Sequence, residues 1–344
     1  MKKIIFFDTE INPKSEKILD IGALAENGKT FHSNSLQDFA EFLSDAKYIC
    51  GHNIIKHDLH YLEKHINDSY AGKFLIIDTL YLSPLLFPKK PYHRLVKDEK
   101  LQTNELNNPV NDSQKAQELF YDEITAFNNL PEILKQILFI LLQNEAEFKH
   151  FFVYLSYNKK SEMPLERIIK EYFRDKICSN TDLNNLIQNY PIELAYCLSL
   201  INCTDRNSIT PPWVLKSYSE IDRIIYLLRD KPCLSGCEYC KEVLDAGKGL
   251  NKFFGFNSFR TFEGESLQED AVNTAIENKS LLAVFPTGGG KSLTFQIPAL
   301  MSGENSKGLT IIISPLQSLM KDQVDNLEKV GIKSIYGKCR QNSN

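Results

Sequence analysis

Short apolar runs alternate with amphipathic stretches over residues 1 to about 125. Runs of about four to eight apolar residues bounded by polar or turn residues predict strands, whereas apolar residues three and four positions apart predict helices. Strands are predicted at KIIFFDTE, KILDIGALAE, KYIC and FLIID, and helices at DFAEFLSDA, HDLHYLEKH and SQKAQELFYDEITAF. Such alternation is typical of an α/β domain, in which helices cover a sheet.

The pattern becomes almost wholly helical over residues 126–230. Apolar residues recur three and four positions apart in LPEILKQILFILL, LERIIKEYF, LNNLIQNY and EIDRIIYLLRD. We interpret this region as a packed helical spacer in preference to a specific binding element. A cysteine cluster follows at 231–250, and a second α/β pattern occupies 251–344. The chain is therefore expected to have four parts, with an α/β domain (1–125) at one end and another at the other end.

Composition and charge place the chain among ordinary globular proteins. Its 344 residues are 42% hydrophobic and 24% charged, and the length allows about two or three domains. The formal charge of −4 argues against a protein that holds nucleic acid by net charge, although a local basic stripe could do so. The start, MKKIIFFDTE, lacks the pattern of a signal peptide, and the most apolar run, ILKQILFILLQ, falls short of the roughly 20 residues that a membrane span needs. A cytoplasmic protein is expected.

Two carboxylates stand at the end of the first predicted strand. Asp8 and Glu10 in FFDTE are two residues apart and therefore share one face of the strand. Adjacent carboxylates repel each other unless a cation lies between them. Oxygen ligands without a nearby cysteine favour Mg²⁺ or Mn²⁺. A divalent metal explains the pair, although a strand that ends in this way can also be purely structural.

Three further segments strengthen the metal interpretation. They are GHNIIKHDLHYL at 51–62, LIIDTLYLSPLLFP at 75–88 and NNPVNDSQKAQELF at 107–120. Together with FFDTE they resemble the exonuclease motifs of the DEDD superfamily, which are 3′–5′ exonucleases with a ribonuclease H-like fold. The resemblance implies a set of four carboxylates that bind two Mg²⁺ or Mn²⁺ ions: Asp8, Glu10, Asp58 and Asp112. The reaction it implies is two-metal hydrolysis of DNA from the 3′ end.

Two positions depart from the DEDD pattern. His57 occupies the place where the second-motif carboxylate usually stands, and Asp58 follows it directly. The general base of the family, a His or a Tyr shortly before the last Asp, is replaced by Asn107 and Asn108, which cannot take a proton near neutral pH. His93, in the basic stretch KKPYHRLVKDEKL, is the alternative catalytic candidate, and a surface-loop histidine is the competing interpretation. The same stretch is a candidate for contact with the nucleic-acid backbone.

Three of the eight cysteines cluster in PCLSGCEYCKEV, as Cys233, Cys237 and Cys240. A cytosolic chain would keep them as thiols, and their spacing favours a small zinc knuckle. Because Zn²⁺ prefers four ligands in a tetrahedron, a fourth ligand must come from elsewhere in the chain. We select Cys203 as the candidate, with Cys197 or a histidine as alternatives. Buried cysteines that bind no metal are the competing interpretation.

The segment LLAVFPTGGGKS carries a phosphate-binding pattern. A predicted strand leads to three glycines, whose backbone N–H groups can turn toward a phosphate. Lys291 would reach the β- and γ-phosphates of ATP, and Ser292 would contribute a ligand to Mg²⁺. Phe285 replaces the first glycine of the general pattern. The predicted ATP-binding residues of the loop are Thr287, Gly288, Gly289, Gly290, Lys291 and Ser292.

The flanks of this loop identify it more closely than the glycines do. FFGFNSFR and LQED precede it, and the predicted strand LTIIISP leads into LQSLMKDQVDNL after it. These segments resemble the RecQ family of DNA helicases. The resemblance implies a P-loop (RecA-like) ATPase domain in which Gln268 reads the adenine edge and Arg260 lies beside the nucleotide.

The order of the parts resembles a bacterial RecQ variant with an N-terminal exonuclease. The chain lacks a later Asp-Glu-x-His segment and a second lobe, so we expect a truncated helicase that does not unwind DNA alone. The leading hypothesis is a metal-dependent exonuclease acting on DNA, joined to an incomplete ATP-binding domain. The alternatives are a non-catalytic DNA- or ATP-binding remnant and one half of a helicase completed by a separate chain.

Overall fold

The computed structural model describes residues 3–66, 72–93, 95, 108–203, 205, 208–286, 288–332 and 334–335. It contains two compact units, each with its own internal packing. Unit 1 comprises Met1–Tyr172 and Leu183–Ile221, and unit 2 comprises Phe173–Asp182 and Asp222–Asn344. Residues from the helical middle of the chain therefore contribute to both units.

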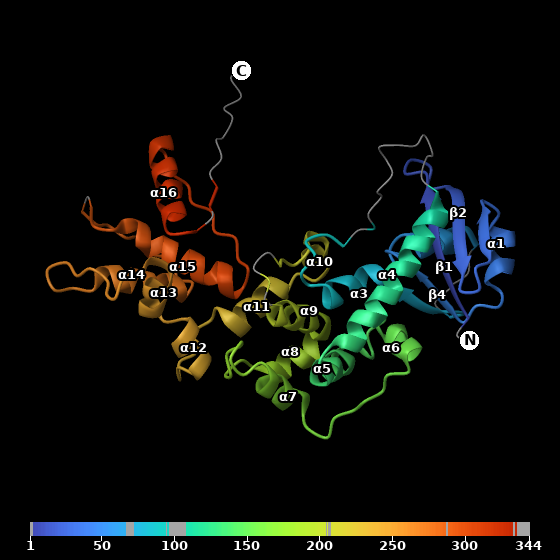
Figure 1. The fold of residues 1–344 in the computed structure, drawn as a ribbon, viewed down its shortest axis with the longest axis horizontal. Coiled ribbons are helices and arrows are strands. Elements are labelled where there is room, and N and C mark those ends of the chain that lie inside the picture. The colour runs from blue at the N-terminus through green and yellow to red at the C-terminus, as the bar shows by residue number, and fades with distance from the viewer. Residues whose placement is uncertain are drawn as a thin grey trace, which may run out of the picture. The chain divides into compact units, whose positions relative to one another are not determined.

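Unit 1 is built around one mixed five-stranded sheet (Figure 1). Its strands are β1 (Ile4–Ile11), β2 (Ile18–Ala25), β3 (Thr30–Ser33), β4 (Tyr48–Gly51) and β5 (Leu75–Asp78). They lie in the order β3-β2-β1-β4-β5. β2 pairs antiparallel with both β1 and β3, whereas β4 pairs parallel with both β1 and β5. The four strands predicted from the sequence are confirmed as β1, β2, β4 and β5, whereas the short β3 was not predicted.

The two faces of β1 have different neighbours because successive side chains of a strand point to opposite faces. Phe7 packs with the helices α1 (Leu36–Leu43) and α2 (Asp58–Ile66) in an apolar core on one face of the sheet. Phe6 faces the other side, where its ring lies 5.7 Å from that of Phe120 on α4 (Pro109–Asn129). In Figure 1, α4 runs along the sheet. Asp8 is two residues after Phe6 and therefore lies on the same face of the strand, which is the face that α4 covers.

The helices that follow the sheet extend the core of unit 1. They are α3 (Thr79–Leu86), α5 (Glu132–Leu142), α6 (Lys149–Leu155), α7 (Leu165–Tyr172), α8 (Leu183–Asn189), α9 (Pro191–Asn202) and α10 (Pro212–Ser217). Tyr196 on the largely buried α9 donates a hydrogen bond to the Tyr81 carbonyl of α3 at 2.9 Å. The helical character predicted for this region is confirmed. Among the described residues, no helix combines the length and the apolar character needed to cross a membrane.

Unit 2 is helical in the part of the chain that the structure describes. After α11 (Ile221–Arg229) come α12 (Glu238–Val243), α13 (Ala246–Phe254), α14 (Leu267–Ile276), α15 (Lys291–Asn305) and α16 (Gln317–Lys329). Leu250, Val272 and Ile297 are buried together where α13, α14 and α15 meet. This small core supports the glycine-rich loop, which lies immediately before α15.

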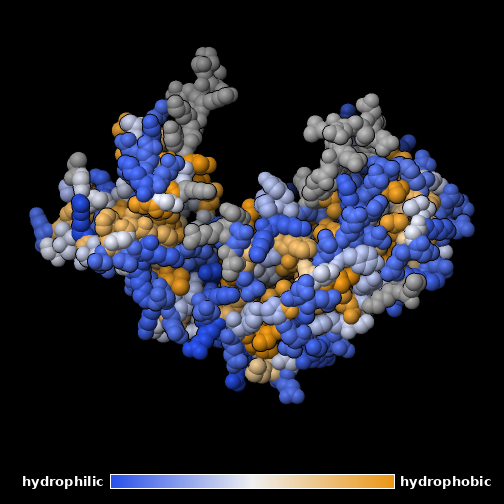
Figure 2. Space-filling view, in the orientation of Figure 1, coloured by the Kyte–Doolittle hydropathy of each residue, from blue (hydrophilic) through white to orange (hydrophobic). Residues whose placement is uncertain are grey.

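The strands predicted at 281–285 and 309–315 are not formed within the described residues. Both segments lack regular secondary structure, and their apolar side chains are exposed, with 92% of Leu282 and 93% of Ile313 accessible to solvent. A strand exists only when its backbone pairs with another strand, and no such partner lies beside either segment among the described residues. Figure 2 shows hydrophobic surface (orange) beside α15 and α16. The prediction of a sheet in this region was wrong for the described residues.

Asp78 and Glu123 are the most deeply buried carboxyl groups among the described residues of unit 1. Asp78 ends β5, and its carboxylate accepts hydrogen bonds from the backbone N–H groups of Asn53, Ile55 and Leu80 at 2.9–3.0 Å. Burial raises the pKa of Asp78 to about 7. Glu123, on α4, is fully buried, and neither of its side-chain oxygens has a hydrogen-bond partner among the described residues. Burial, together with the nearby charge of Asp78, raises the pKa of Glu123 well above its ordinary value.

Replacing Glu123 with Gln is expected to flatten the pH dependence of stability. Glu123 has a higher pKa in the folded than in the unfolded protein. Such a carboxyl contributes its full stabilisation of the folded state below its unfolded pKa, and this contribution is lost as pH rises toward its folded pKa. Above about pH 4.3, the free energy of unfolding of the unmodified protein should fall relative to Glu123→Gln by about 1.4 kcal/mol per pH unit. Urea unfolding between about pH 4.5 and 8 measures the difference. Glu118→Gln, at an exposed position of α4, is the control, and a difference that stays constant with pH would contradict the expectation.

Candidate functional site

Three of the predicted metal-binding carboxylates lie together. Asp8 and Glu10 stand on β1, and Asp112 stands in the first turn of α4. One carboxylate oxygen from each lies within 4.8 Å of the others. Asp8 and Glu10 are half-buried and Asp112 is buried. Such a set of close oxygen atoms suits a small hard cation, since carboxylates held this close repel one another without one.

The start of α4 is locally determined and sets the place of Asp112. Asn108 caps the helix, with its side-chain oxygen accepting a hydrogen bond from the Val110 N–H at 3.0 Å. Pro109 occupies the first turn, where its missing N–H costs nothing. Asp112 follows in the same turn, so its carboxylate also lies near the positive end of the helix dipole.

Gly22 lets α4 approach the sheet closely. It pairs with Asp8 in the β1–β2 register, and a Cβ atom built at Gly22 would lie 2.2 Å from the backbone of Pro109 and of Val110. The hydroxyl of Ser113 lies 2.8 Å from the Gly22 carbonyl and ties the helix to β2. The absence of a side chain at Gly22 therefore allows Asp112 to stand opposite Asp8.

The structure does not bring Asp58 into this group. Its carboxylate is buried and accepts two hydrogen bonds from Thr9, from the backbone N–H at 2.8 Å and from the hydroxyl at 2.6 Å. Asp58 thus ties the N-terminus of α2 to the residue between Asp8 and Glu10. His57, beside it, is half-exposed, and its Nδ1 atom lies 3.7 Å from the Asp58 carboxylate. The contact with Asp58 raises the pKa of His57, and the charge of Glu10 raises it further.

His93 is buried, contrary to the surface-loop interpretation. Its Nδ1 atom lies 2.8 Å from the Ser83 hydroxyl of α3, and burial lowers the pKa of His93 to about 4. It does not belong to the carboxylate group formed by the described residues. Asn107, at one of the family's general-base positions, and most of the basic stretch after His93 lie outside the described residues.

Sequence reasoning missed a half-buried histidine, His52. The Nδ1 atom of His52 lies 2.9 Å from the Thr79 hydroxyl, and burial lowers the pKa of His52 to about 4. The charge of Asp112 opposes this lowering of the pKa of His52. The sequence signal that could have identified it is its position directly after β4, in the segment GHNIIKHDLHYL that resembles the second DEDD motif.

A second cluster is made of cysteines. The sulfur atoms of Cys233, Cys237 and Cys240 lie together as predicted, and the fourth member is Cys178. Cys203 is not part of the cluster, and its sulfur lies 2.9 Å from the Ser208 hydroxyl instead. The prediction of Cys203 was wrong as to the residue that completes the group of four. Cys178 stands 59 residues before Cys237, where no local spacing pattern points to it.

The glycine-rich loop has the conformation that its glycines permit. Gly288 and Gly290 have φ angles of 77° and 72°, in the left-handed region, and Gly290 caps the N-terminus of α15. Lys291 begins the helix and donates a hydrogen bond to the Phe285 carbonyl at 3.0 Å, while Ser292 follows it in the first turn. Thr287 lies outside the described residues.

The two upstream residues implicated by resemblance contact this loop. Gln268 donates a hydrogen bond to the Gly290 carbonyl at 2.9 Å and accepts one from the Arg260 N–H at 3.0 Å. The Arg260 guanidinium in turn donates to the Gly288 carbonyl at 2.9 Å. Glycines with left-handed φ angles, a helix N-terminus and a lysine form an anion-binding arrangement. Gln268 and Arg260 brace its backbone from one side.

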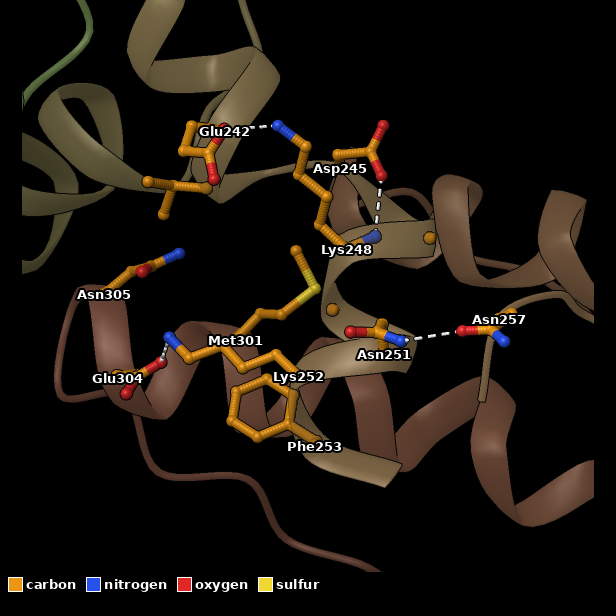
Figure 3. A pocket seen from close by; sticks show the side chains of 13 residues that line it. Glu242, Asp245, Lys248, Asn251, Lys252, Phe253, Asn257, Met301, Glu304 and Asn305 are labelled. Atoms are coloured by element: carbon orange, nitrogen blue, oxygen red, sulfur yellow. Dashed lines mark hydrogen bonds and ion pairs between the residues drawn. The ribbon is translucent and has the colours of Figure 1, made fainter. Parts of the chain in front are cut away.

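A pocket of about 750 Å³, lined by charged, amide and apolar side chains, lies at the other end of α15. Figure 3 shows Lys248 paired with Glu242 and Lys252 paired with Glu304 across it. Because both lysines are already neutralised by carboxylates, the pocket does not offer them to a phosphate. The helix of 15 residues separates this pocket from the glycine-rich loop by about 20 Å, so the pocket is not the nucleotide site.

Comparisons with known proteins concern the C-terminal region. Residues 265–343 match the DEAD/DEAH box helicase family. The chain is 34% identical over 154 residues to ATP-dependent DNA helicase hus2/rqh1 of Schizosaccharomyces pombe, covering 43% of this chain and 11% of that protein. It is 48% and 49% identical over 87 residues to the ATP-dependent DNA helicases RecQ of Bacillus subtilis and Haemophilus influenzae, covering 25% of this chain and 13% of each relative. No solved structure matches significantly.

These matches show that residues 265–343 are similar to DEAD/DEAH box helicases, and that the chain is similar over 87 residues to two RecQ helicases. The chain spans 11% to 13% of the length of these three curated relatives. The loop that carries Gly288, Gly290 and Lys291 lies inside the matched residues, as does Gln268. The sequence resemblance to RecQ helicases is therefore supported for this region.

Proposed function

We propose that the sheet domain of unit 1 is a metal-dependent 3′–5′ exonuclease that acts on DNA, and that the helicase-like region binds ATP. The close group formed by Asp8, Glu10 and Asp112 is the observation that carries the nuclease part. The mixed five-stranded sheet, with two of these residues on its central strand, is in keeping with the ribonuclease H-like domain that the sequence resemblance implies. The helicase matches contribute nothing to this part of the proposal.

The residues present fit Mg²⁺ or Mn²⁺, because the donor atoms of the group are all carboxylate oxygens. When bound there, such ions would supply an activated water and stabilise the leaving 3′ oxygen. Asp8 and Glu10 would hold the metal from the strand, and Asp112 would hold it from the helix. Asp58 would act by fixing the backbone of Thr9 between the two strand carboxylates. The half-exposed His57 offers an imidazole on the Glu10 side, where it can contact the phosphate backbone.

A labelled-oligonucleotide assay tests the nuclease proposal. Single-stranded DNA labelled at the 5′ end should give a ladder of shortened products with Mg²⁺ or Mn²⁺ and none with chelator. The same strand labelled at the 3′ end should release its label first as a mononucleotide. The reaction should proceed without ATP, since the carboxylate group belongs to unit 1 and the glycine-rich loop to unit 2. Lack of cleavage with either metal would favour a non-catalytic DNA-binding role.

The nucleotide part of the proposal rests on the loop braced by Gln268 and Arg260. Lys291 and the N-terminus of α15 would hold the phosphates, and Ser292 would face the accompanying Mg²⁺. DNA is the proposed substrate of the whole protein, by analogy with the relatives named as DNA helicases.

Replacing Lys291 with Ala is expected to weaken binding of an ATP analogue by about ten- to hundredfold. A hydrogen bond between charged groups contributes about 1.5–3 kcal/mol, and each 1.4 kcal/mol changes affinity about tenfold. Titration of a fluorescent ATP analogue measures the change. Lys329→Ala, in the last turn of α16, is the control and should bind like the unmodified protein. Equal affinities of the Lys291→Ala variant and the unmodified protein would contradict the assignment of the loop.

A further inference from the structure

The four-cysteine cluster of unit 2 has no part in the proposed nuclease or nucleotide site. We propose that Cys178, Cys233, Cys237 and Cys240 bind one structural Zn²⁺ ion. The ion would fasten the segment Phe173–Asp182 to the residues that lead from α11 to α13. This assignment is independent of the proposed function, because none of these cysteines lies at the carboxylate group or at the glycine-rich loop.

The spacing of the sulfur atoms matches a single tetrahedral ion. Zinc–sulfur bonds of about 2.3 Å in a regular tetrahedron place the sulfurs about 3.8 Å apart. The sulfurs of Cys178 and Cys237 are 3.8 Å apart, and all four lie within 4.8 Å of one another. An iron–sulfur cluster inserts several iron and sulfide atoms between its cysteines and would hold them farther apart. The geometry therefore favours one ion with four thiolate ligands.

The turn between Cys233 and Cys237 brings these two residues close enough to bind one ion. Gly236 has a φ angle of 59°, in the left-handed region, and returns the chain toward Cys233. The Cys237 backbone N–H then donates to the Cys233 sulfur at 3.1 Å. The side-chain amide of Asn180 donates to the same sulfur at 3.2 Å. Such N–H donors around a sulfur stabilise its thiolate form and are typical of the surroundings of metal ligands.

The cluster is closed toward solvent on one side by apolar packing. Cys178 and Cys240 are buried, and Tyr239 and Leu244 are buried with them. With four protein ligands available, no coordination position remains for water or substrate, which is the arrangement of a structural zinc site. All four cysteines are without disulfide bonds in the structure, as a reducing cytosol would keep them.

The cluster also explains why the segment Phe173–Asp182 belongs to unit 2 although its neighbours in sequence belong to unit 1. The Cys178 N–H donates to the Leu228 carbonyl at 2.8 Å, and the Thr181 hydroxyl donates to the Leu227 carbonyl at 2.9 Å. Two such bonds contribute only about 1–3 kcal/mol together. A metal that joins residues 59 positions apart adds a constraint on the unfolded chain that these bonds cannot.

Metal analysis of the full-length chain tests the proposal. The protein purified under reducing conditions with zinc present should contain one zinc per chain by mass spectrometry of the elements. Cys178→Ser should lose at least half of this zinc, whereas Cys203→Ser, at a cysteine outside the cluster, should retain it. Equal losses in both variants, or zinc well below one per chain in the unmodified protein, would overturn the assignment.

A measurement on the unmodified chain covers the case in which Cys178→Ser fails to fold. After replacement of the metal by Co²⁺, the chain should show the intense visible bands of a tetrahedral cobalt ion and a sulfur-to-cobalt charge-transfer band. A weak octahedral spectrum would contradict four thiolate ligands. Iron and acid-labile sulfide in the purified protein, with visible absorption, would replace the zinc assignment by an iron–sulfur cluster.

Discussion

Asp8→Asn is expected to lower metal-dependent shortening of DNA by about 1000-fold or more. Asp8 contributes an oxygen to the group that also contains Glu10 and Asp112, and the amide replaces a charged ligand with a neutral one of the same shape. A metal at a reacting phosphate lowers the barrier by several kcal/mol, and about 4 kcal/mol corresponds to about a thousandfold in rate. Single-turnover cleavage of a 5′-labelled strand at saturating Mg²⁺ measures the loss.

The control for this experiment is Asp45→Asn. Asp45 is exposed and pairs with Lys3 at 3.4 Å, away from the carboxylate group. An exposed pair of this kind contributes little to stability, so the variant should cleave at the rate of the unmodified protein. If Asp8→Asn retains the full rate while remaining folded, any cleavage arises elsewhere or from a contaminant, and the proposed active site is wrong.

Gly22→Ala is expected to lower nuclease activity by about 100-fold through backbone displacement. The added methyl would stand 2.2 Å from the backbone of Pro109 and Val110, so the start of α4 must move away from β2. Forced movement of this kind destabilises by about 1–3 kcal/mol. It would also carry Asp112 away from Asp8, and a displacement of about 1 Å at a reacting centre can cost about 100-fold in rate. Urea unfolding and the cleavage assay together measure both effects.

Gly72→Ala is the matched control, because no atom lies within 4 Å of a Cβ at that position and its backbone is not left-handed. It should leave stability and cleavage unchanged within about 0.5 kcal/mol and about twofold. The activity of Gly22→Ala should be measured where circular dichroism shows it to be folded. A folded variant with unchanged cleavage would show that the position of α4 does not determine the site.

The local features of the first domain were predictable from the sequence. The alternation in KIIFFDTE predicted β1 and placed Asp8 and Glu10 on one face of the strand, and the structure confirms the strand. The helical spacing that starts at Ser113 predicted most of α4, and the cap at Asn108 with Pro109 extends it upstream. The short strand β3 was not predicted, because four residues carry too little periodicity to distinguish a strand from a loop.

Other expectations failed because they depended on partners that a local pattern does not contain. Residues 281–285 and 309–315 have the composition of buried strands, yet neither pairs with another strand among the described residues. Asp58 has the chemistry of a metal ligand, but its carboxylate accepts hydrogen bonds from the backbone N–H and the hydroxyl of Thr9. His93 stands in a basic stretch typical of a surface loop, but its side chain is buried and contacts the Ser83 hydroxyl.

The sequence by itself determined which residues can bind a metal or a phosphate and which short elements carry them. The spacing of Asp8 and Glu10, the glycines before Lys291 and the turn between Cys233 and Cys237 all follow from positions a few residues apart. Only the tertiary structure decided which distant residues complete each group. It completed the cysteine group with Cys178 and left Asp58 out of the carboxylate group, whereas Asp112 was already expected from the sequence resemblance. The physical reason is that periodicity reports one turn or one strand at a time, whereas contacts across tens of residues depend on how whole elements pack.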